Sequence, residues 1–224
     1  MMNWLRGCWA VFLKDARLEW RNRFAVNLLF MFVLSSLLLI AFSLGREAVG
    51  PRVEVALLWM VILFSAALGL GRSFVAEEEQ GTVMLLQLNL HGSQVLAGKM
   101  LFNFLLLMAV NLTALVVMRF LLTLSIEDTG LLLATLALGS LGLAAATTML
   151  AAIIARASAS GPLLPVLLFP MLAPLLLSVV RASRHALEGG LGWSASGNDL
   201  ITLVAFAGVV TTAAFMLFEH VWTD

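Results

Sequence analysis

The chain has 224 residues, of which 62% are hydrophobic and only 12% are charged, and its mean hydropathy is +1.03. An ordinary soluble domain carries about 25% charged residues, and a fold of this size exposes too much surface to hide so many apolar side chains from water. The composition therefore excludes a soluble enzyme and predicts an integral membrane protein. The 13 basic and 13 acidic residues cancel, so the net charge does not indicate nucleic-acid binding, and the single cysteine, Cys8, excludes an internal disulfide.

The segment at residues 4–23 is amphipathic. Apolar residues recur at helical spacing on one face, and basic residues lie mostly on the other. The apolar set is Leu5, Trp9, Phe12, Leu13, Ala16 and Trp20. Aromatic residues opposite basic ones are typical of a helix lying in the membrane interface. Such a helix is either a simple membrane anchor or an elbow helix at the entrance of a transporter domain.

Six apolar stretches follow, and a helix needs about 20 such residues to cross the hydrocarbon core. The predicted spans are 24–44, 55–71, 100–122, 131–155, 162–180 and 200–218. Lipid offers no partners for free backbone groups, so the spans must be helical. The fold class predicted is thus an all-α membrane protein with six transmembrane helices in one domain covering residues 1–224. With both termini in the cytoplasm, the cytoplasmic segments hold more Lys and Arg than the outer loops do. Basic residues favour the cytoplasmic side, so this excess predicts that orientation.

The longest polar connection is the predicted cytoplasmic loop at residues 72–99. It carries the acidic run Glu77, Glu78 and Glu79 and then an apolar run with helical potential. A short amphipathic helix on this face is suited to docking into a partner's groove; the alternative is a solvated loop. We expect Gly92 to end that short helix and Ser93 to cap the next span.

Residues 92–99 superficially resemble a phosphate-binding loop, G-S-Q-V-L-A-G-K. The motif needs four residues between its glycines and Ser or Thr after the lysine. Here five residues intervene, Met100 follows Lys99, and a predicted span begins directly. We therefore reject nucleotide binding, so any nucleotide hydrolysis must belong to another subunit.

The fifth predicted span contains four prolines, Pro162, Pro165, Pro170 and Pro174. Interior prolines remove backbone hydrogen bonds and kink a helix, and membrane helices tolerate them when neighbours satisfy the freed groups. The span is either a bent packing helix or a segment that flexes during gating. The fourth span is rich in small residues, which predicts close helix packing.

The sequence carries no pattern that indicates catalysis. It contains no H-E-x-x-H, C-x-x-C or G-x-S-x-G motif. No acidic residue lies deep in a predicted span, which disfavours a proton-coupled transporter. We therefore assign no catalytic residue and no metal ligand, and a membrane-embedded enzyme is the least favoured class.

Several stretches resemble a known family over nearly the whole chain. They are Lys14-Asp15-Ala-Arg17-Leu-Glu19, the Leu-Gly-Leu-Gly-Arg-Ser-Phe string at 68–74, Gly98-Lys99, residues 138–142, the proline ladder at 162–170, and Phe218-Glu219. On these residues the sequence resembles the CcmB family of bacterial cytochrome c maturation, the haem exporter protein B family.

The resemblance implies a non-catalytic permease subunit with an ABC-2-type exporter fold in the bacterial inner membrane. It implies a CcmA-like ATPase, CcmC-like and CcmD-like membrane proteins and, indirectly, the CcmE haem chaperone as partners; a homodimer is a further option. Haem would be a handled ligand and not a stable cofactor, and ATP would act only through the partner. The rival interpretation is an ABC-2-type exporter of a glycan, lipid or drug.

The resemblance also assigns roles to residues. The loop after span two would couple to the ATPase through Arg72, Glu77, Glu78, Glu79, Gly81, Leu85 and Leu86. The acidic run departs from the alternating charges of the family, and no proline stands near His91. Apart from the resemblance, the residues Arg181, Arg184 and His185 in the outer loop after span five could meet haem, although polar loop residues are the commoner interpretation.

Overall fold

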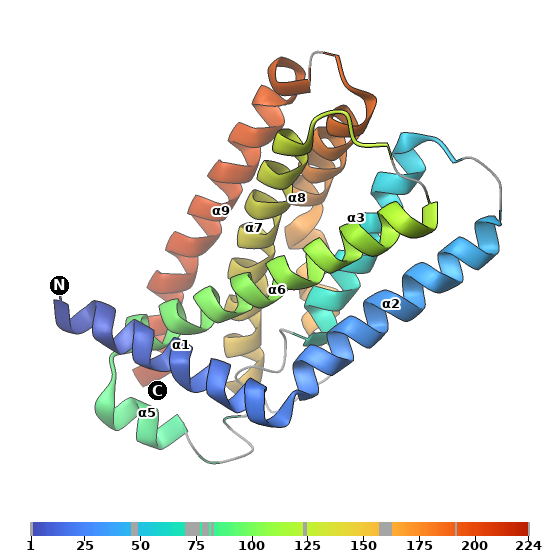
Figure 1. Cartoon of the computed structure of the whole chain (residues 1–224). Helices are drawn as coiled ribbons and strands as arrows, with labels where there is room; N and C mark the ends of the chain where they lie inside the picture. Colours follow the sequence, from blue (N-terminus) through green and yellow to red (C-terminus); the bar gives the residue numbers. More distant parts are fainter. Residues whose placement is uncertain are drawn as a thin grey trace.

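The computed structural model describes residues 2–45, 49–69, 77, 81, 83–122, 125–156, 163–190 and 192–223. Within these ranges all regular structure is helical, which confirms the all-α prediction. The helices are α1 (Met2–Asn22), α2 (Phe24–Leu44), α3 (Pro51–Gly69), α5 (Val83–Asn89), α6 (Gly92–Leu122), α7 (Thr129–Arg156), α8 (Leu163–Glu188) and α9 (Gly192–Thr223). Figure 1 shows α1, α5 and the C-terminal end of α9 at one end of the molecule and the α8–α9 corner at the other.

Among the described residues, five helices are long and apolar enough to cross a membrane, namely α2, α3, α6, α7 and α9, so the chain is a multi-pass membrane protein. The fifth predicted span falls on α8, whose side chains at 163–167 lie outside the described residues. The count of six spans therefore stays a prediction. Helices α6 and α9 begin at Gly92 and Gly192, earlier than the predicted spans at 100 and 200, because their first turns continue the helix beyond the apolar stretch.

Helix α7 lies at the centre of the bundle, where it contacts α3, α6, α8 and α9. Its apolar window is 72% buried. Small residues allow this crowding, because a Cβ at Gly139 would lie 2.3 Å from the Trp59 ring and one at Gly142 would lie 2.3 Å from Leu175. The predicted small-residue packing of this span is confirmed.

Side-chain hydrogen bonds join the central helices. Two amides on α6 donate to hydroxyls on α7, Asn103 to Thr148 at 2.8 Å and Asn111 to Ser140 at 2.6 Å. On the other side of the bundle, the Trp59 indole of α3 donates to Ser183 of α8 at 2.9 Å. In lipid such bonds hold helices together, because each polar group would otherwise lack a partner.

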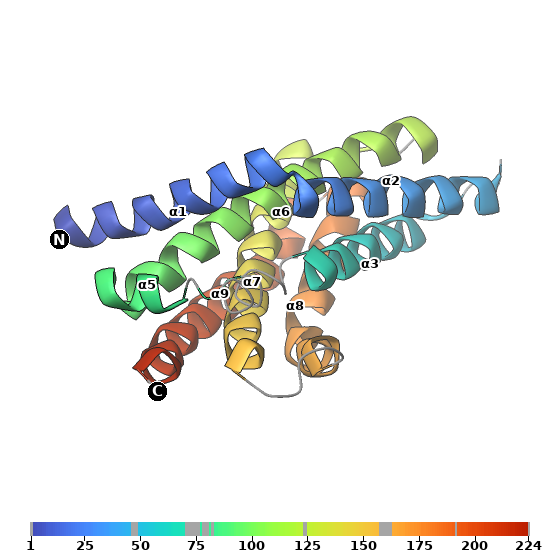
Figure 2. The same ribbon diagram turned by 90° about the horizontal axis from the view of Figure 1, so that it is seen from below.

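Helices α1 and α2 meet at a bend (Figure 1) and, seen from below, run end to end with α6 alongside both (Figure 2). The bend lies at Arg23, which adopts a left-handed conformation with φ of 51°. The predicted amphipathic segment at residues 4–23 forms helix α1, whereas its location in the membrane interface stays a prediction. Its packed face is centred on Val11, whereas Leu5, Trp9 and Trp20 of the predicted apolar face are exposed, as lipid contact requires.

Candidate functional site

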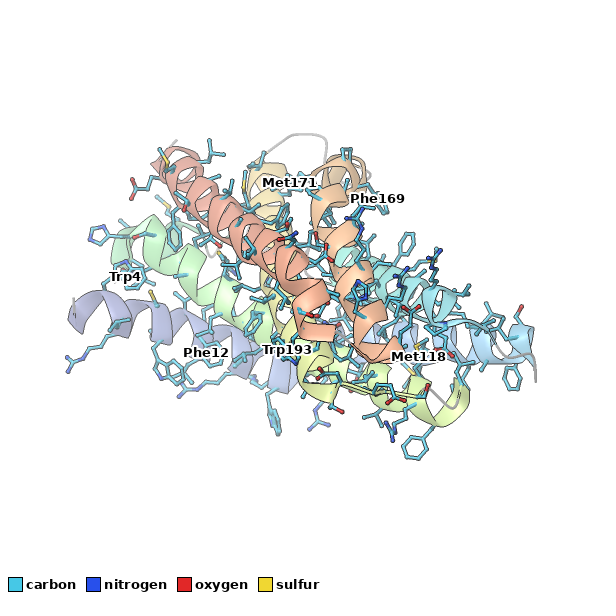
Figure 3. All side chains as sticks on the ribbon, turned by 90° about the horizontal axis from the view of Figure 1, so that it is seen from above. Trp4, Phe12, Met118, Phe169, Met171 and Trp193 are labelled. Atoms are coloured by element: carbon cyan, nitrogen blue, oxygen red, sulfur yellow. The ribbon has the colours of Figure 1, made fainter. Side chains whose placement is uncertain are left out.

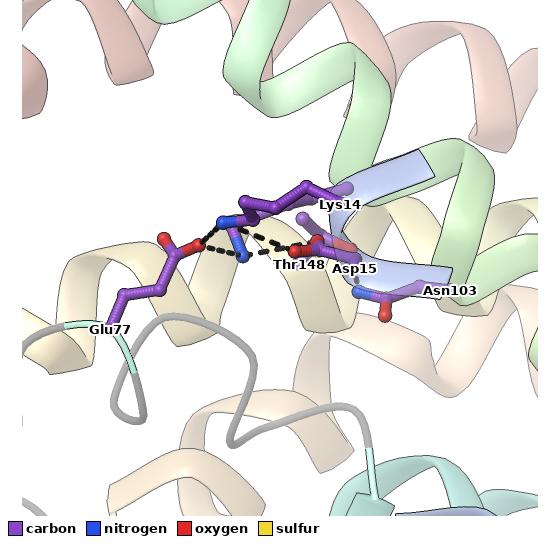
Figure 4. A network of polar contacts seen from close by, with 6 residues as sticks. Lys14, Asp15, Glu77, Asn103 and Thr148 are labelled. Carbon is purple, nitrogen blue, oxygen red and sulfur yellow. Dashed lines mark hydrogen bonds and ion pairs between the residues drawn. The ribbon is translucent and has the colours of Figure 1, made fainter. Parts of the chain in front are cut away.

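Four charged side chains from three separate segments meet where α1 crosses the start of α6 (Figure 4). Lys14 and Asp15 come from α1, Glu77 from the connection before α5, and Lys99 from α6. Lys99 Nζ lies 3.0 Å from Glu77 Oε1 and 3.3 Å from Asp15 Oδ2, and Lys14 Nζ lies 3.2 Å from Asp15 Oδ1. Lys14 Nζ also contacts Glu77 Oε1. We call these residues the charged quartet.

The quartet is largely buried and electrically balanced. Lys99 is 1% exposed and Glu77 is 6% exposed, so each charge depends on its partners for stabilisation. Burial alone would lower the pKa of Lys14, but the carboxylates of Asp15 and Glu77 outweigh it and raise the pKa above its ordinary value. The quartet therefore holds two cations against two anions and ties α1, the connection at Glu77 and α6 into one unit.

Two glycines let α1 approach α6 closely enough for these contacts. A Cβ on Gly98 would lie 2.7 Å from the Cys8 carbonyl oxygen and 2.7 Å from Val11 Cβ, and one on Gly7 would lie 2.7 Å from the Gln94 side chain. The Gly98-Lys99 pair that superficially resembles a phosphate-binding loop thus has a structural use: the glycine permits the helix crossing, and the lysine joins the quartet.

A short helix, α5, is present where the sequence predicted one, and its docking role stays a prediction. Gly81, in a turn before it, has φ of +65°. Two apolar side chains one turn apart on α5, Met84 and Leu88, are 71% and 76% exposed. Leu86 is half-buried and packs against the core. Among the α5 side chains that the structure describes, Met84 and Leu88 thus form an exposed apolar face. Neither was among the predicted coupling residues, although their i, i+4 spacing was an available signal.

The remaining predicted coupling residues are not placed. Arg72, Glu78 and Glu79 lie outside the described residues, as does the side chain of Leu85. Their roles stay predictions. Glu77, expected at a docking surface, lies in the charged quartet instead.

The predicted start of the third span was wrong in its details. Gly92 does not break a helix but is the first residue of α6, and Ser93 is not the cap. The backbone N–H groups of Gln94 and Val95 donate to the His91 carbonyl, and the Gln94 side chain accepts from the His91 N–H at 3.1 Å. Gln94 thereby satisfies a terminal N–H group as in a capping box, which leaves Ser93 Oγ to accept from the Trp4 indole at 3.1 Å; Figure 3 shows Trp4 beside the start of α6.

Helix α8 contains two of the four prolines, Pro170 and Pro174, in its interior. Both are exposed on the helix surface. Pro162 and the side chain of Pro165 lie outside the described residues. A gating role for this helix stays a prediction.

The predicted haem-contact residues lie in the last turns of α8, which ends at Glu188, and Figure 1 shows this end of α8 at the opposite end of the molecule from α5. Arg181 lies 4.0 Å from Asp199, and Arg184 lies 3.2 Å from Glu188. His185 is half-buried, and its carbonyl accepts from the Gly189 N–H at 3.2 Å. Among the residues that the structure describes, no three His, Cys, Asp or Glu side chains are grouped as metal ligands.

Comparison with known proteins addresses the family directly. The sequence matches the CcmB protein family over residues 6–221, which includes all four quartet residues and α5. The chain belongs to the CcmB family. Heme exporter protein B of Bradyrhizobium diazoefficiens is 28% identical to this CcmB-family chain over 196 residues, covering 87% of the chain and 88% of the relative. The resemblance read from the sequence is thus confirmed.

Proposed function

We propose that this chain is the membrane-spanning permease subunit of an ABC-type complex that serves haem export or delivery in c-type cytochrome biogenesis. Membership of the CcmB family supports the assignment, as does the relative named Heme exporter protein B. ATP hydrolysis would take place on a separate CcmA-like subunit. CcmC-like and CcmD-like membrane proteins and a CcmE-like haem chaperone would complete the assembly.

The observation that carries the coupling proposal is the exposed apolar face of α5. Met84 and Leu88 lie on a seven-residue helix outside the predicted spans, at 71% and 76% exposure. Exposed apolar residues at i and i+4 are the usual anchors of a helix that binds in a groove. We infer that α5 is the coupling helix and that these two side chains enter a groove of the ATPase.

The charged quartet connects this helix to the membrane domain. Glu77 belongs to the connection that leads into α5, and its partners lie on α1 and α6. Movement of α5 would therefore pull on two helices at once, the interfacial α1 and the membrane-crossing α6. A rigid ionic connection suits such transmission, because packed polar clusters resist gradual deformation.

We place α1, α5 and both termini on the cytoplasmic side of the inner membrane. The arrangement of these segments at one end of the molecule is consistent with this orientation (Figure 1). Arg17, Arg21 and Arg23 are exposed near the end of α1, and basic residues next to a first span favour the cytoplasm.

The test is co-purification of an ATP-binding subunit from native membranes with Met84→Ser plus Leu88→Ser. Each exposed apolar side chain contributes about 1.5–3 kcal/mol when it becomes buried, so losing both should lower recovery of the ATPase more than tenfold. The matched control, Met84→Leu plus Leu88→Met, keeps the apolar face and should preserve recovery. Unchanged recovery with the serine pair would disprove the docking role of α5.

The haem assignment has a separate test. Deletion of the gene should abolish mature c-type cytochromes, detected by haem staining of membrane proteins, and the wild-type chain should restore them. A deletion strain with normal c-type cytochromes would favour the rival exporter of another substrate.

A further inference from the structure

A cavity of about 500 Å³ lies in the angle between α1, α2 and α6. Aromatic rings line it from two sides, with Phe12 and Trp20 on α1 and Phe102 on α6. The centroids of Phe12 and Phe102 lie 6.4 Å apart, so the Phe12 ring lies on the side of α1 that faces α6. The cavity is independent of the charged quartet, because none of the four quartet residues lines it.

The cavity is polar at the bend and apolar along α6. At the bend it is bordered by Arg23, whose guanidinium lies 5.8 Å from the Trp20 ring centroid. Further along, Leu105 and Leu106 of α6 form an apolar wall. A ligand that fits both ends has a charged head and a hydrocarbon tail.

Arg23 is available to a ligand. Its Nε donates to the Trp20 carbonyl oxygen at 3.4 Å, and within the described part of the chain this is the one hydrogen bond its side chain makes to protein. A guanidinium has five donors, so most of its donors remain for an anion. The backbone at Arg23 is left-handed, with φ of 51°, and such strain often accompanies a binding function.

One carboxylate also borders the cavity. Glu19 Oε1 accepts the Val26 N–H at 2.8 Å and so caps the start of α2. The Glu19 carboxylate therefore interacts with the N-terminal end of α2, where the helix dipole stabilises an anion. Arg17 and Arg21 are exposed on the neighbouring turns of α1, so the local charge, including Glu19, is positive.

We propose that this cavity binds one anionic phospholipid, with its phosphate at Arg23 and an acyl chain along Phe102, Leu105 and Leu106. Clustered basic residues on an amphipathic helix attract anionic lipid headgroups. A docked helix is a poorer fit, because a cylinder about 10 Å wide with a pitch of 5.4 Å fills roughly the whole cavity with a single turn. The bound lipid would fill the angle of the bend and fix α1 against α2.

The experiment measures lipid binding to the purified full-length chain in mild detergent by native mass spectrometry. Dioleoyl phosphatidylglycerol and dioleoyl phosphatidylcholine are titrated separately, and inorganic phosphate is tested for thermal stabilisation. We expect phosphatidylglycerol to bind about fivefold more tightly than phosphatidylcholine, which is the effect of about one basic residue at a membrane surface. Equal binding of the two lipids would overturn the proposal. So would a thermal stabilisation by inorganic phosphate alone that equals the stabilisation by phosphatidylglycerol.

Variants locate the site. Arg23→Asn removes the charge, and asparagine tolerates a left-handed backbone, so phosphatidylglycerol binding should fall about fivefold to the level of phosphatidylcholine. Arg23→Lys should retain the preference. Ala16→Trp fills the cavity and should weaken both lipids. The control Arg6→Gln removes an exposed charge of α1 that does not border the cavity and should change binding less than twofold.

Two outcomes of the variants would contradict the proposal. Equal losses with Arg23→Asn and Arg6→Gln would mean that the charge of α1 acts diffusely and not through a site. Unchanged phosphatidylglycerol binding in Ala16→Trp, or a polypeptide that co-purifies with the wild type and is lost in that variant, would exclude lipid as the occupant. Thermal unfolding of each variant verifies folding, and none of these measurements requires the ATPase, so they are independent of the proposed coupling function.

Discussion

Replacing Lys99 by methionine removes one ammonium group of the charged quartet while keeping an unbranched side chain of similar length. Lys99 Nζ faces Glu77 Oε1 at 3.0 Å and Asp15 Oδ2 at 3.3 Å. At an effective dielectric constant of about 20, each contact is worth roughly 5 kcal/mol before desolvation is subtracted. Since Lys99 is 1% exposed, desolvation offsets much of this gain. The variant leaves two carboxylates facing a single cation.

Breaking a buried ion pair from one side costs about 3–5 kcal/mol, and we expect Lys99→Met to lower the free energy of unfolding by that amount. The assay is reversible unfolding of the purified chain in mixed micelles, followed by tryptophan fluorescence. Arg119→Met is the matched control, because Arg119 is an exposed cation in the last turn of the same helix. Its effect should stay within about 0.5 kcal/mol.

A double-mutant cycle with Glu77→Gln isolates the interaction itself. Residues in one buried ionic network usually show coupling energies of about 0.5–3 kcal/mol, and we expect a value in the upper half of that range. A loss below about 1 kcal/mol for Lys99→Met, or a cycle with no measurable coupling, would refute the view that the quartet ties the connection at Glu77 to α6.

Three further predictions concern packing, polar contacts and pH. Gly98→Leu should force α1 away from α6 and speed maleimide labelling of Cys8, whose thiol pKa is raised by burial; Gly197→Leu, at a glycine facing open space, should not. Asn111→Leu removes the 2.6 Å hydrogen bond to α7 and should cost about 0.6–1.7 kcal/mol in the same unfolding assay, and no loss would contradict the bond's role. The pKa of Lys14 is raised in the fold, so the stability that its charge contributes should be complete below the unfolded pKa of about 10.4. This stability should disappear as the pH rises through the higher folded pKa. The prediction would be contradicted if the difference in stability between wild type and Lys14→Met stayed the same above pH 11, roughly half a unit beyond the unfolded pKa.

The sequence was sufficient for features that depend on local pattern. Runs of apolar residues predicted the spans now seen as α2, α3, α6, α7 and α9, and helical periodicity predicted α1 and α5. These properties follow from hydropathy and from backbone hydrogen bonding in lipid, which act on consecutive residues. Where α6 begins was not predictable in the same way, because its cap depends on how His91 and Gln94 pair.

The candidate site was only partly predictable, because its members are far apart in the chain. Glu77 was selected for an expected surface, yet it lies against Lys14 and Lys99, which are 63 and 22 positions away in the sequence. On α5, periodicity alone does not show which side faces the core; the packing of Leu86 decides that Met84 and Leu88 face outward. Both results depend on tertiary contacts and not on local pattern.

Helix α6 runs from Gly92 to Leu122 without a proline. Its 31 residues span about 46 Å at 1.5 Å per residue, which is enough to reach from one headgroup layer to the other. Lys99 lies two turns from one end and Met118 one turn from the other. A stiff rod of this length amplifies small rotations: from Lys99 to the far tip is about 35 Å, so a tilt of about 5° at the quartet displaces that tip by roughly 3 Å. A modest ionic rearrangement on one side of the bilayer thus becomes a displacement of atomic-diameter scale on the other.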